Sequence, residues 1–150
     1  MNELRHFPTG KDILGVGWHF PVRVDRRLAG EMTAPDRGRG GIALARYEDD
    51  IEQAIRIILS TRKGERRMRP EFGCDIHDLV FAEANSTTFS LLRYYVEEAL
   101  SFWEPRITLR EVVVSATPDE GRVDLLINYE VRATKDPRSL VYPFFTIGEE

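Results

Sequence analysis

The stretch that decides the fold is Glu104-Pro105-Arg106-Ile107, because a long helical pattern ends there and a β pattern begins. Pro105 has no backbone N–H and restricts the residue before it, so a helix cannot continue through it. Glu104 and Arg106 therefore flank a rigid corner. We expect one of these charges to face back to the helix and the other to face into the strand.

Two helices are predicted on the N-terminal side of this corner. The first spans about Glu48 to Thr61, with acidic residues in its first turn, where the helix dipole favours negative charge. Gly64 follows as the expected C′ glycine. The second helix starts near the Asn85-Ser86 cap and runs to about Phe102. Apolar residues at helical spacing mark the two buried faces: Ile51, Ala54, Ile55, Ile58 and Leu59, then Phe89, Leu92, Val96, Ala99, Leu100 and Trp103.

An antiparallel sheet is predicted on the C-terminal side. The alternation that begins at Ile107 loses its phase around Glu111, which indicates a bulge. A long half-buried strand alternates from Val123 to Ala133, and Leu140–Phe145 is expected to form an edge strand because it contains Pro143. The fold class is therefore α+β, with two main helices packed on a small antiparallel sheet formed by the C-terminal half.

Residues 1–45 are predicted to be an irregular N-terminal arm, and residues 46–150 the α+β domain. The arginine- and glycine-rich stretch 23–41 cannot bury a face of its own, so we expect a loop there. Residues 65–84 are expected to be extended, with a turn at Phe72-Gly73 and a short helical piece after it. Trp18 and Phe20 are expected to anchor the arm by packing on the helices.

Composition narrows the function classes. The chain has 150 residues, a formal net charge of −4 and 31% charged residues, which argues against a general nucleic-acid binder. A single cysteine, Cys74, allows no internal disulfide and suits a reducing compartment. The sequence has neither a signal peptide pattern nor an apolar run long enough to span a membrane, so we expect the protein to be made and kept in the cytoplasm.

Two charged segments are the candidate sites, and each has a simpler alternative. Residues 62–73 concentrate five basic side chains, which could form only a solvated loop or could recognise carboxylates of a partner protein. The pair Glu104 and Arg106 could be only an exposed ion pair at a helix end, or it could hold a partner or a buried local network.

No catalytic, metal or cofactor pattern is coherent. Cys74, Asp75, His77 and Asp78 crowd together without a second ligand cluster, so we expect no metal. The nearby thiol and imidazole have no evident orienting group. The early glycines form no phosphate-binding fingerprint, and we expect no cofactor. Glu71, Glu83 and Glu104 could serve a glycoside hydrolase only if two of them flanked a sugar cleft.

Several of these motifs together resemble the baseplate wedge family of contractile phage tails, type VI secretion systems and phage-tail-like injection particles. The matching residues are Gly15, Gly17, Phe20 and Pro21, then Gly64-Glu65-Arg66, then Arg69-Pro70-x-Phe72-Gly73, and finally Glu104-Pro105-Arg106-Ile107. The resemblance spans roughly Gly15 to Phe145. It implies a structural baseplate subunit that is not an enzyme, although members of this family have carried a lysozyme-like label.

The resemblance also implies partners and a site. The expected partners are larger baseplate wedge subunits and the sheath protein, with tube or spike-hub proteins as further candidates, and several copies lie in a ring. The subunit would link the inner wedge proteins to the first sheath ring and initiate sheath assembly. The implied protein-interaction residues are Glu65, Arg66, Arg69, Phe72, Gly73, Glu104, Pro105, Arg106, Tyr142 and Phe144. A peptidoglycan hydrolase and a nucleic-acid-binding module remain the alternative functions.

Overall fold

The structure is a computed structural model, and it describes residues 16–25, 41–42, 44–117 and 121–146. The chain divides into two compact units, Met1–Gln53 and Ala54–Glu150. The candidate site lies in the second unit.

Helix α1 spans Glu48–Ser60, close to the predicted Glu48–Thr61, and has three acidic residues in its first turn. It ends where Thr61 donates both its backbone N–H and its hydroxyl to the carbonyl of Ile57, at 3.1 and 2.7 Å. Gly64 does have a positive φ of 86°. It is not at the predicted C′ position, because the helix ends at Ser60 and Gly64 lies in the turn that follows it.

Helix α2 spans Ser86–Trp103 and confirms the predicted cap, since the Asn85 side chain accepts a hydrogen bond from the N–H of Thr88 at 2.9 Å. Most of the predicted face is buried, whereas Phe89 and Trp103 are only half-buried. The core of the protein, with every side chain at most 5% exposed, includes Ile55, Leu59, Ile76, Leu92, Val96, Leu100, Val112, Leu125, Ile127, Tyr129, Leu140 and Phe144.

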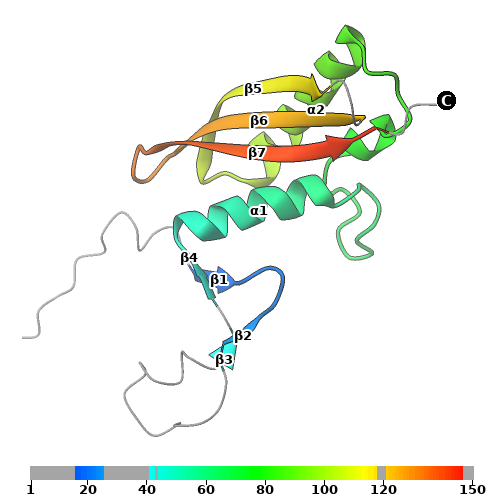
Figure 1. Ribbon diagram of the computed structural model, residues 1–150. Helices are drawn as coiled ribbons and strands as arrows, with labels where there is room; N and C mark the ends of the chain where they lie inside the picture. Colours follow the sequence, from blue (N-terminus) through cyan, green and yellow to red (C-terminus); the bar gives the residue numbers. More distant parts are fainter. Residues whose placement is uncertain (1–15, 26–40, 43, 118–120, 147–150) are drawn as a thin grey trace, which may run out of the picture. The chain divides into compact units, whose positions relative to one another are not determined.

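The C-terminal sheet has three antiparallel strands in the order β5-β6-β7 (Figure 1). These are β5 (Ile107–Thr117), β6 (Arg122–Val131) and β7 (Pro137–Phe145). The register shifts between Leu109 and Glu111, which confirms the predicted bulge. Strand β6 ends at Val131 rather than Ala133, because a turn with Lys135 at φ 59° starts the return to β7.

Residues alternate strictly along β6 between buried and half-buried positions. The buried set pairs across the sheet with Leu140, Tyr142 and Phe144 of β7, so one face of the sheet belongs to the core. Helix α2 packs on this sheet through its contacts with β5. The fold is therefore the predicted α+β arrangement, with two helices packed on a three-stranded antiparallel sheet.

The segment between the helices differs from its prediction. Residues 65–74 form successive turns rather than an extended stretch, and a short 3₁₀ helix, η3 (Asp75–Leu79), follows. Backbone bonds from Arg69 to Arg66 and from Phe72 to Arg69, both 3.1 Å, close these turns. The physical reason is the density of charged residues, which leaves no apolar alternation that a strand could use.

The predicted irregular arm contains short strands in its described part. Strand β1 (Val16–Trp18) pairs with β4 (Leu44–Arg46), and β2 (Val24–Asp25) pairs with β3 (Gly41–Ile42). Trp18 and Phe20 are 68% and 55% exposed, and their packing on the helices stays a prediction. A two-stranded ribbon is too small to bury such rings. Most of the arginine- and glycine-rich loop lies outside the described residues.

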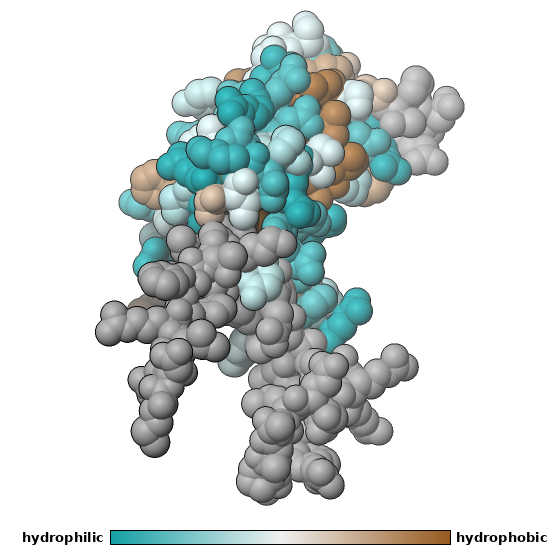
Figure 2. Space-filling model, turned by 90° about the vertical axis from the view of Figure 1, so that its left-hand side faces the viewer, coloured by the Kyte–Doolittle hydropathy of each residue, from teal (hydrophilic) through white to brown (hydrophobic). Residues whose placement is uncertain are grey.

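Among the described residues, the structure contains no helix with the length and apolarity needed to cross a membrane. The face shown in Figure 2 is mainly hydrophilic and carries one strip of hydrophobic residues along its margin.

Candidate protein-interaction site

The helix-to-strand corner holds a charge pair that closes on itself. Arg106 donates from Nε to one carboxylate oxygen of Glu104 at 2.7 Å and from Nη2 to the other at 2.8 Å. The backbone N–H of Arg106 adds a third contact at 3.3 Å. The two side chains therefore face each other across Pro105, and the prediction that they point to different elements is wrong.

Burial makes this pair more than a surface ion pair. The Glu104 side chain is 3% exposed and that of Arg106 is 30% exposed. A bidentate guanidinium fork is the geometry that best satisfies a buried carboxylate. Glu104 is also the C-cap of α2, where its backbone N–H donates to the carbonyl of Leu100 at 3.0 Å. The corner is a rigid local network with an accessible edge at Arg106.

The 62–73 loop contributes a second ordered group. The Arg66 guanidinium carbon lies 4.2 Å from the centroid of the Phe72 ring, a cation–π distance. Glu65 caps the start of the loop by accepting the N–H of Arg62 at 3.1 Å. Arg69 takes part through its backbone. The structure thus brings Glu65, Arg66, Arg69, Phe72 and Gly73 together in one compact loop.

Gly73 fixes the path of this loop. Its φ is 122°, and a Cβ built on it would lie 2.2 Å from the carbonyl oxygen of Thr61. Only glycine fits so close to another backbone at that dihedral. The next residue, Cys74, donates its N–H to the same Thr61 carbonyl at 2.9 Å, which ties the loop to the end of α1.

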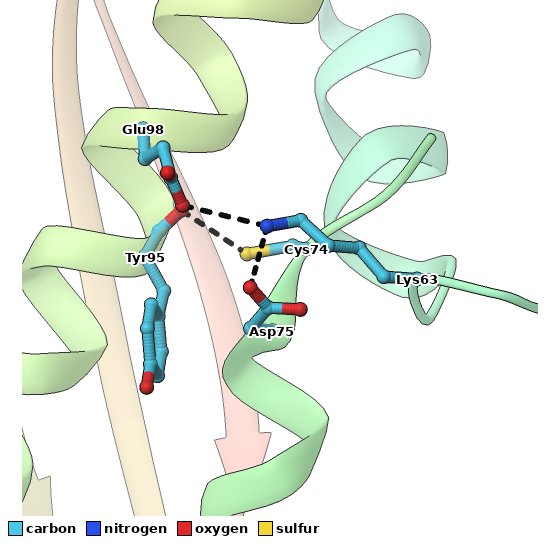
Figure 3. A network of polar contacts seen from close by, with 5 residues as sticks. All are labelled: Lys63, Cys74, Asp75, Tyr95 and Glu98. Carbon is cyan, nitrogen blue, oxygen red and sulfur yellow. Dashed lines mark hydrogen bonds and ion pairs between the residues drawn. The ribbon is translucent and has the colours of Figure 1, made fainter. Parts of the chain in front are cut away.

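Sequence reasoning missed a polar network beside this loop, drawn in Figure 3. The ammonium group of Lys63 lies 2.5 Å from Asp75 and 3.4 Å from Glu98, so it joins the loop, η3 and α2. The hydrogen bond to Asp75 is the main cause that raises the pKa of Lys63. Sequence spacing could not reveal this network, because 35 positions separate Lys63 from its partner on α2.

Cys74 is a buried core residue and an unsuitable nucleophile. Its side chain is fully buried, and its thiol contacts the carbonyl of Tyr95 at 3.4 Å. Desolvation by burial raises the pKa of the thiol to about 11. The neighbouring His77 is engaged elsewhere, since its Nε2 lies 2.9 Å from the carbonyl of Leu59. No group of three or more metal-ligating side chains gathers within the described part of the chain.

The sheet offers a second candidate surface, the outer edge of β7. Neither of the two interaction residues predicted on β7 is well exposed, since Tyr142 is half-buried and Phe144 is 5% exposed. Burial is the main cause that raises the pKa of Tyr142. The side chains that do reach solvent on β7 include Val141 and Phe145, at 48% and 57% exposure.

Backbone geometry decides which groups that edge presents. The backbone N–H of Thr146 donates to the carbonyl of Gly121 at 2.7 Å, and the backbone N–H of Val131 donates to the carbonyl of Asp136 at 3.0 Å. The even-numbered residues of β7 therefore turn their N–H and C=O groups toward β6. The odd-numbered residues of β7 therefore turn theirs outward. Pro137 and Pro143 are among these outward-facing residues. Because proline has no N–H, a strand tolerates it only where that position faces away from the neighbouring strand. The outward N–H donors of β7 are those of Ser139, Val141 and Phe145.

The described residues thus present a small α+β scaffold with a rigid polar corner, an ordered arginine–aromatic loop and an open strand edge. Arginine and aromatic side chains and open strand edges are features through which proteins bind other proteins. The chain belongs to the family described as baseplate wedge protein gp25, which it matches over residues 45–136.

Individual relatives agree with this assignment. The chain is 33% identical over 81 residues to baseplate wedge protein gp25 of Enterobacteria phage T4, a match that covers 54% of this chain and 61% of the phage protein. A chain in the post-contraction baseplate of pyocin R2 is 32% identical, with a TM-score of 0.55, over 74% of this chain and 98% of that one.

Two further structures are similar. A Geobacter sulfurreducens protein, provisionally described as a tail lysozyme, is 49% identical with a TM-score of 0.64 over 71% of this chain and 97% of its own. A chain of the anti-feeding prophage baseplate has a TM-score of 0.61 over 92% of this chain and 90% of its own. Its identity of 23% supports the likeness of fold alone.

Proposed function

We propose that this baseplate wedge protein links larger wedge subunits to the first sheath ring of a contractile particle and initiates sheath assembly. The observation that carries the proposal is the family match over residues 45–136, which includes both the 62–73 loop and the Glu104–Arg106 corner. Residues 46–150 would form the wedge domain, with residues 1–45 as an arm attached to it.

The corner and the loop suit contact with wedge subunits. A partner that approaches Arg106 meets a guanidinium already oriented by Glu104, so little side-chain entropy is lost on binding. Arg66 is held in the same way on the ring of Phe72. Preorganised arginines and aromatic rings are the residues that most often dominate binding energy at protein interfaces.

The edge of β7 suits the sheath protein. An extended segment can add to an open strand edge through main-chain hydrogen bonds, and a polymer that grows by strand exchange could start there. Several copies of this subunit in a ring are part of the same proposal.

A structural role is also more consistent with the carboxylates than glycoside hydrolysis. Both carboxylate oxygens of Glu104 accept hydrogen bonds from Arg106, so this side chain is not free to act on a substrate as a general acid. Glu71 and Glu83 are exposed to solvent rather than enclosed in an apolar site of the kind that a catalytic carboxyl group occupies.

Deletion and complementation test the proposal. Cells that lack the gene should produce tubes or free sheath protein but no sheathed tails by electron microscopy, and the wild-type gene should restore them. Mass spectrometry of purified particles should find the protein in the baseplate. Normal numbers of sheathed, contractile tails from the deletion strain would refute the proposed role in sheath initiation.

A further inference from the structure

A surface groove lies between the 62–73 loop and the C-terminal half of α2. Its volume is about 400 Å³. An apolar floor is flanked by charged side chains. The lining residues are Lys63, Pro70, Glu71, Glu98, Ala99, Phe102 and Trp103.

One aromatic residue of this groove, Phe102, is unusually accessible. Phe102 is 69% exposed although it belongs to a helix with a well-formed buried face. Its ring packs edge-on against Trp103 at 4.7 Å, and Trp103 packs against Phe72 at 5.0 Å. The rings therefore form a fixed apolar ladder rather than a single loose side chain. Exposed apolar patches of this kind mark sites where a protein partner binds.

The charges of the groove define what kind of partner fits. Lys63 brings one positive charge, but Asp75 and Glu98 both contact it. Glu71 lies on the exposed wall and adds a third carboxylate. Asp75 lies outside the lining, so one positive and two negative lining groups leave a net charge of −1 around the apolar floor. A segment with basic side chains complements this rim, whereas an acidic one is repelled.

We propose that this groove binds a partner segment in which an apolar or aromatic side chain is flanked by Lys or Arg. The apolar side chain would fill the space over Phe102 and Ala99, and the basic group would meet Glu71 and Glu98. The inference rests on the proposed function only for the source of the segment, which would be a wedge subunit of the same particle.

Site-specific crosslinking in assembled particles tests the location and the chemistry together. The photoreactive residue p-benzoylphenylalanine would replace Phe102 in the groove, and in a matched control it would replace Tyr94. Tyr94 is 57% exposed on the same helix but lies about 12 Å closer to the N-terminus of the helix. We expect Phe102 to crosslink to one peptide with a Lys or Arg within four residues of the crosslinked position. An acidic peptide, or equal capture at both positions, would overturn the proposal.

Charge reversal provides the second readout. Glu71→Lys should weaken capture of the co-expressed wedge subunits on the order of tenfold, whereas Glu83→Lys, which reverses an exposed charge outside the groove lining, should not. If Arg106→Ala blocks assembly while Glu71→Lys and Phe102→Ser assemble normally, the groove inference fails and the proposed function stands. If the protein is absent from baseplates altogether, the proposed function itself fails.

Discussion

Arg106 binds both carboxylate oxygens of Glu104, at 2.7 and 2.8 Å, across the single intervening residue Pro105. The Glu104 side chain is almost fully buried, while the Arg106 side chain is 30% exposed. Glu104 is therefore the buried member of this pair and Arg106 the accessible one, and substitutions of the two residues should differ in their effects.

Arg106→Ala should destabilise the domain by about 3 kcal/mol, the lower end of the range for breaking a buried pair, because Glu104 would keep a buried charge without its fork. A domain with about 5–15 kcal/mol of stability stays folded after that loss. Urea denaturation measures the change, and electron microscopy should find that sheathed tails no longer assemble. Arg106→Lys keeps the charge but not the fork, so its loss of stability should be smaller. Unchanged stability and normal assembly in Arg106→Ala would reduce the motif to a helix stop.

Gly73→Ala should be strongly destabilising, by about 3 kcal/mol or more, since it combines a positive φ with a backbone clash against Thr61. Gly64→Ala is the matched control. Gly64 also has a positive φ, of 86°, but nothing lies within 4 Å of a Cβ added there, so about 1 kcal/mol is expected from the dihedral alone. Thermal or urea denaturation of the two variants checks the order. Equal losses would show that the contact with Thr61 is not the constraint.

Cys74 should be unreactive in the folded protein and should make stability fall at alkaline pH. Burial raises its pKa from 9.0 to about 11, so folding favours the protonated thiol. The resulting stability is complete below pH 9 and is lost as pH rises through about 11. A thiol reagent at pH 8 should label the protein only in denaturant. The difference in unfolding free energy between wild type and Cys74→Ala should shrink from pH 9 to 11. Rapid labelling of native protein would contradict this account.

Sequence patterns predicted most of the fold because each long helix and each strand of the C-terminal sheet carries a local signal. The apolar stripe at helical spacing gave α1, the Asn85 cap gave the start of α2, and the loss of alternation near Glu111 gave the bulge. These features depend on neighbours within a few positions. The family motifs likewise gave the residues of the corner and of the loop.

The parts that sequence could not predict depend on contacts between distant positions. Lys63 meets Glu98 only because the loop folds back on α2. Phe102 continues a helical pattern, yet it lies in the exposed groove rather than in the core. In β7 the resemblance implied Phe144 as an interaction residue, whereas its side chain is 5% exposed and lies in the core, opposite Val123 in the sheet register. Such outcomes follow from tertiary packing and pairing register, which no local spacing encodes.

The purified protein should release no sugar fragments from peptidoglycan above a buffer blank. The carboxylates considered for catalysis are either held by an arginine, as in Glu104, or exposed to water, as in Glu71 and Glu83. An active hydrolase of known amount in the same assay provides the positive control. Release that disappears in Glu71→Gln, Glu83→Gln or Glu104→Gln would make the protein an enzyme and would contradict the proposal.

Addition of sheath protein should protect the outer edge of β7 from amide hydrogen exchange in a defined pattern. The outward donors are the N–H groups of Ser139, Val141 and Phe145, while Pro137 and Pro143 provide carbonyls only. An added strand can therefore receive hydrogen bonds from Ser139 and Val141 in succession, and the next position cannot donate.

Residue-resolved exchange should show large gains at Ser139 and Val141 and little change at Leu140 and Tyr142, whose N–H groups already face β6. Val141→Pro should remove the gain because it deletes a central donor, whereas Val141→Thr keeps the donor and should retain it. Protection confined to residues 23–41 would assign docking to the arginine–glycine loop, and protection confined to β5 would assign it to the opposite edge of the sheet.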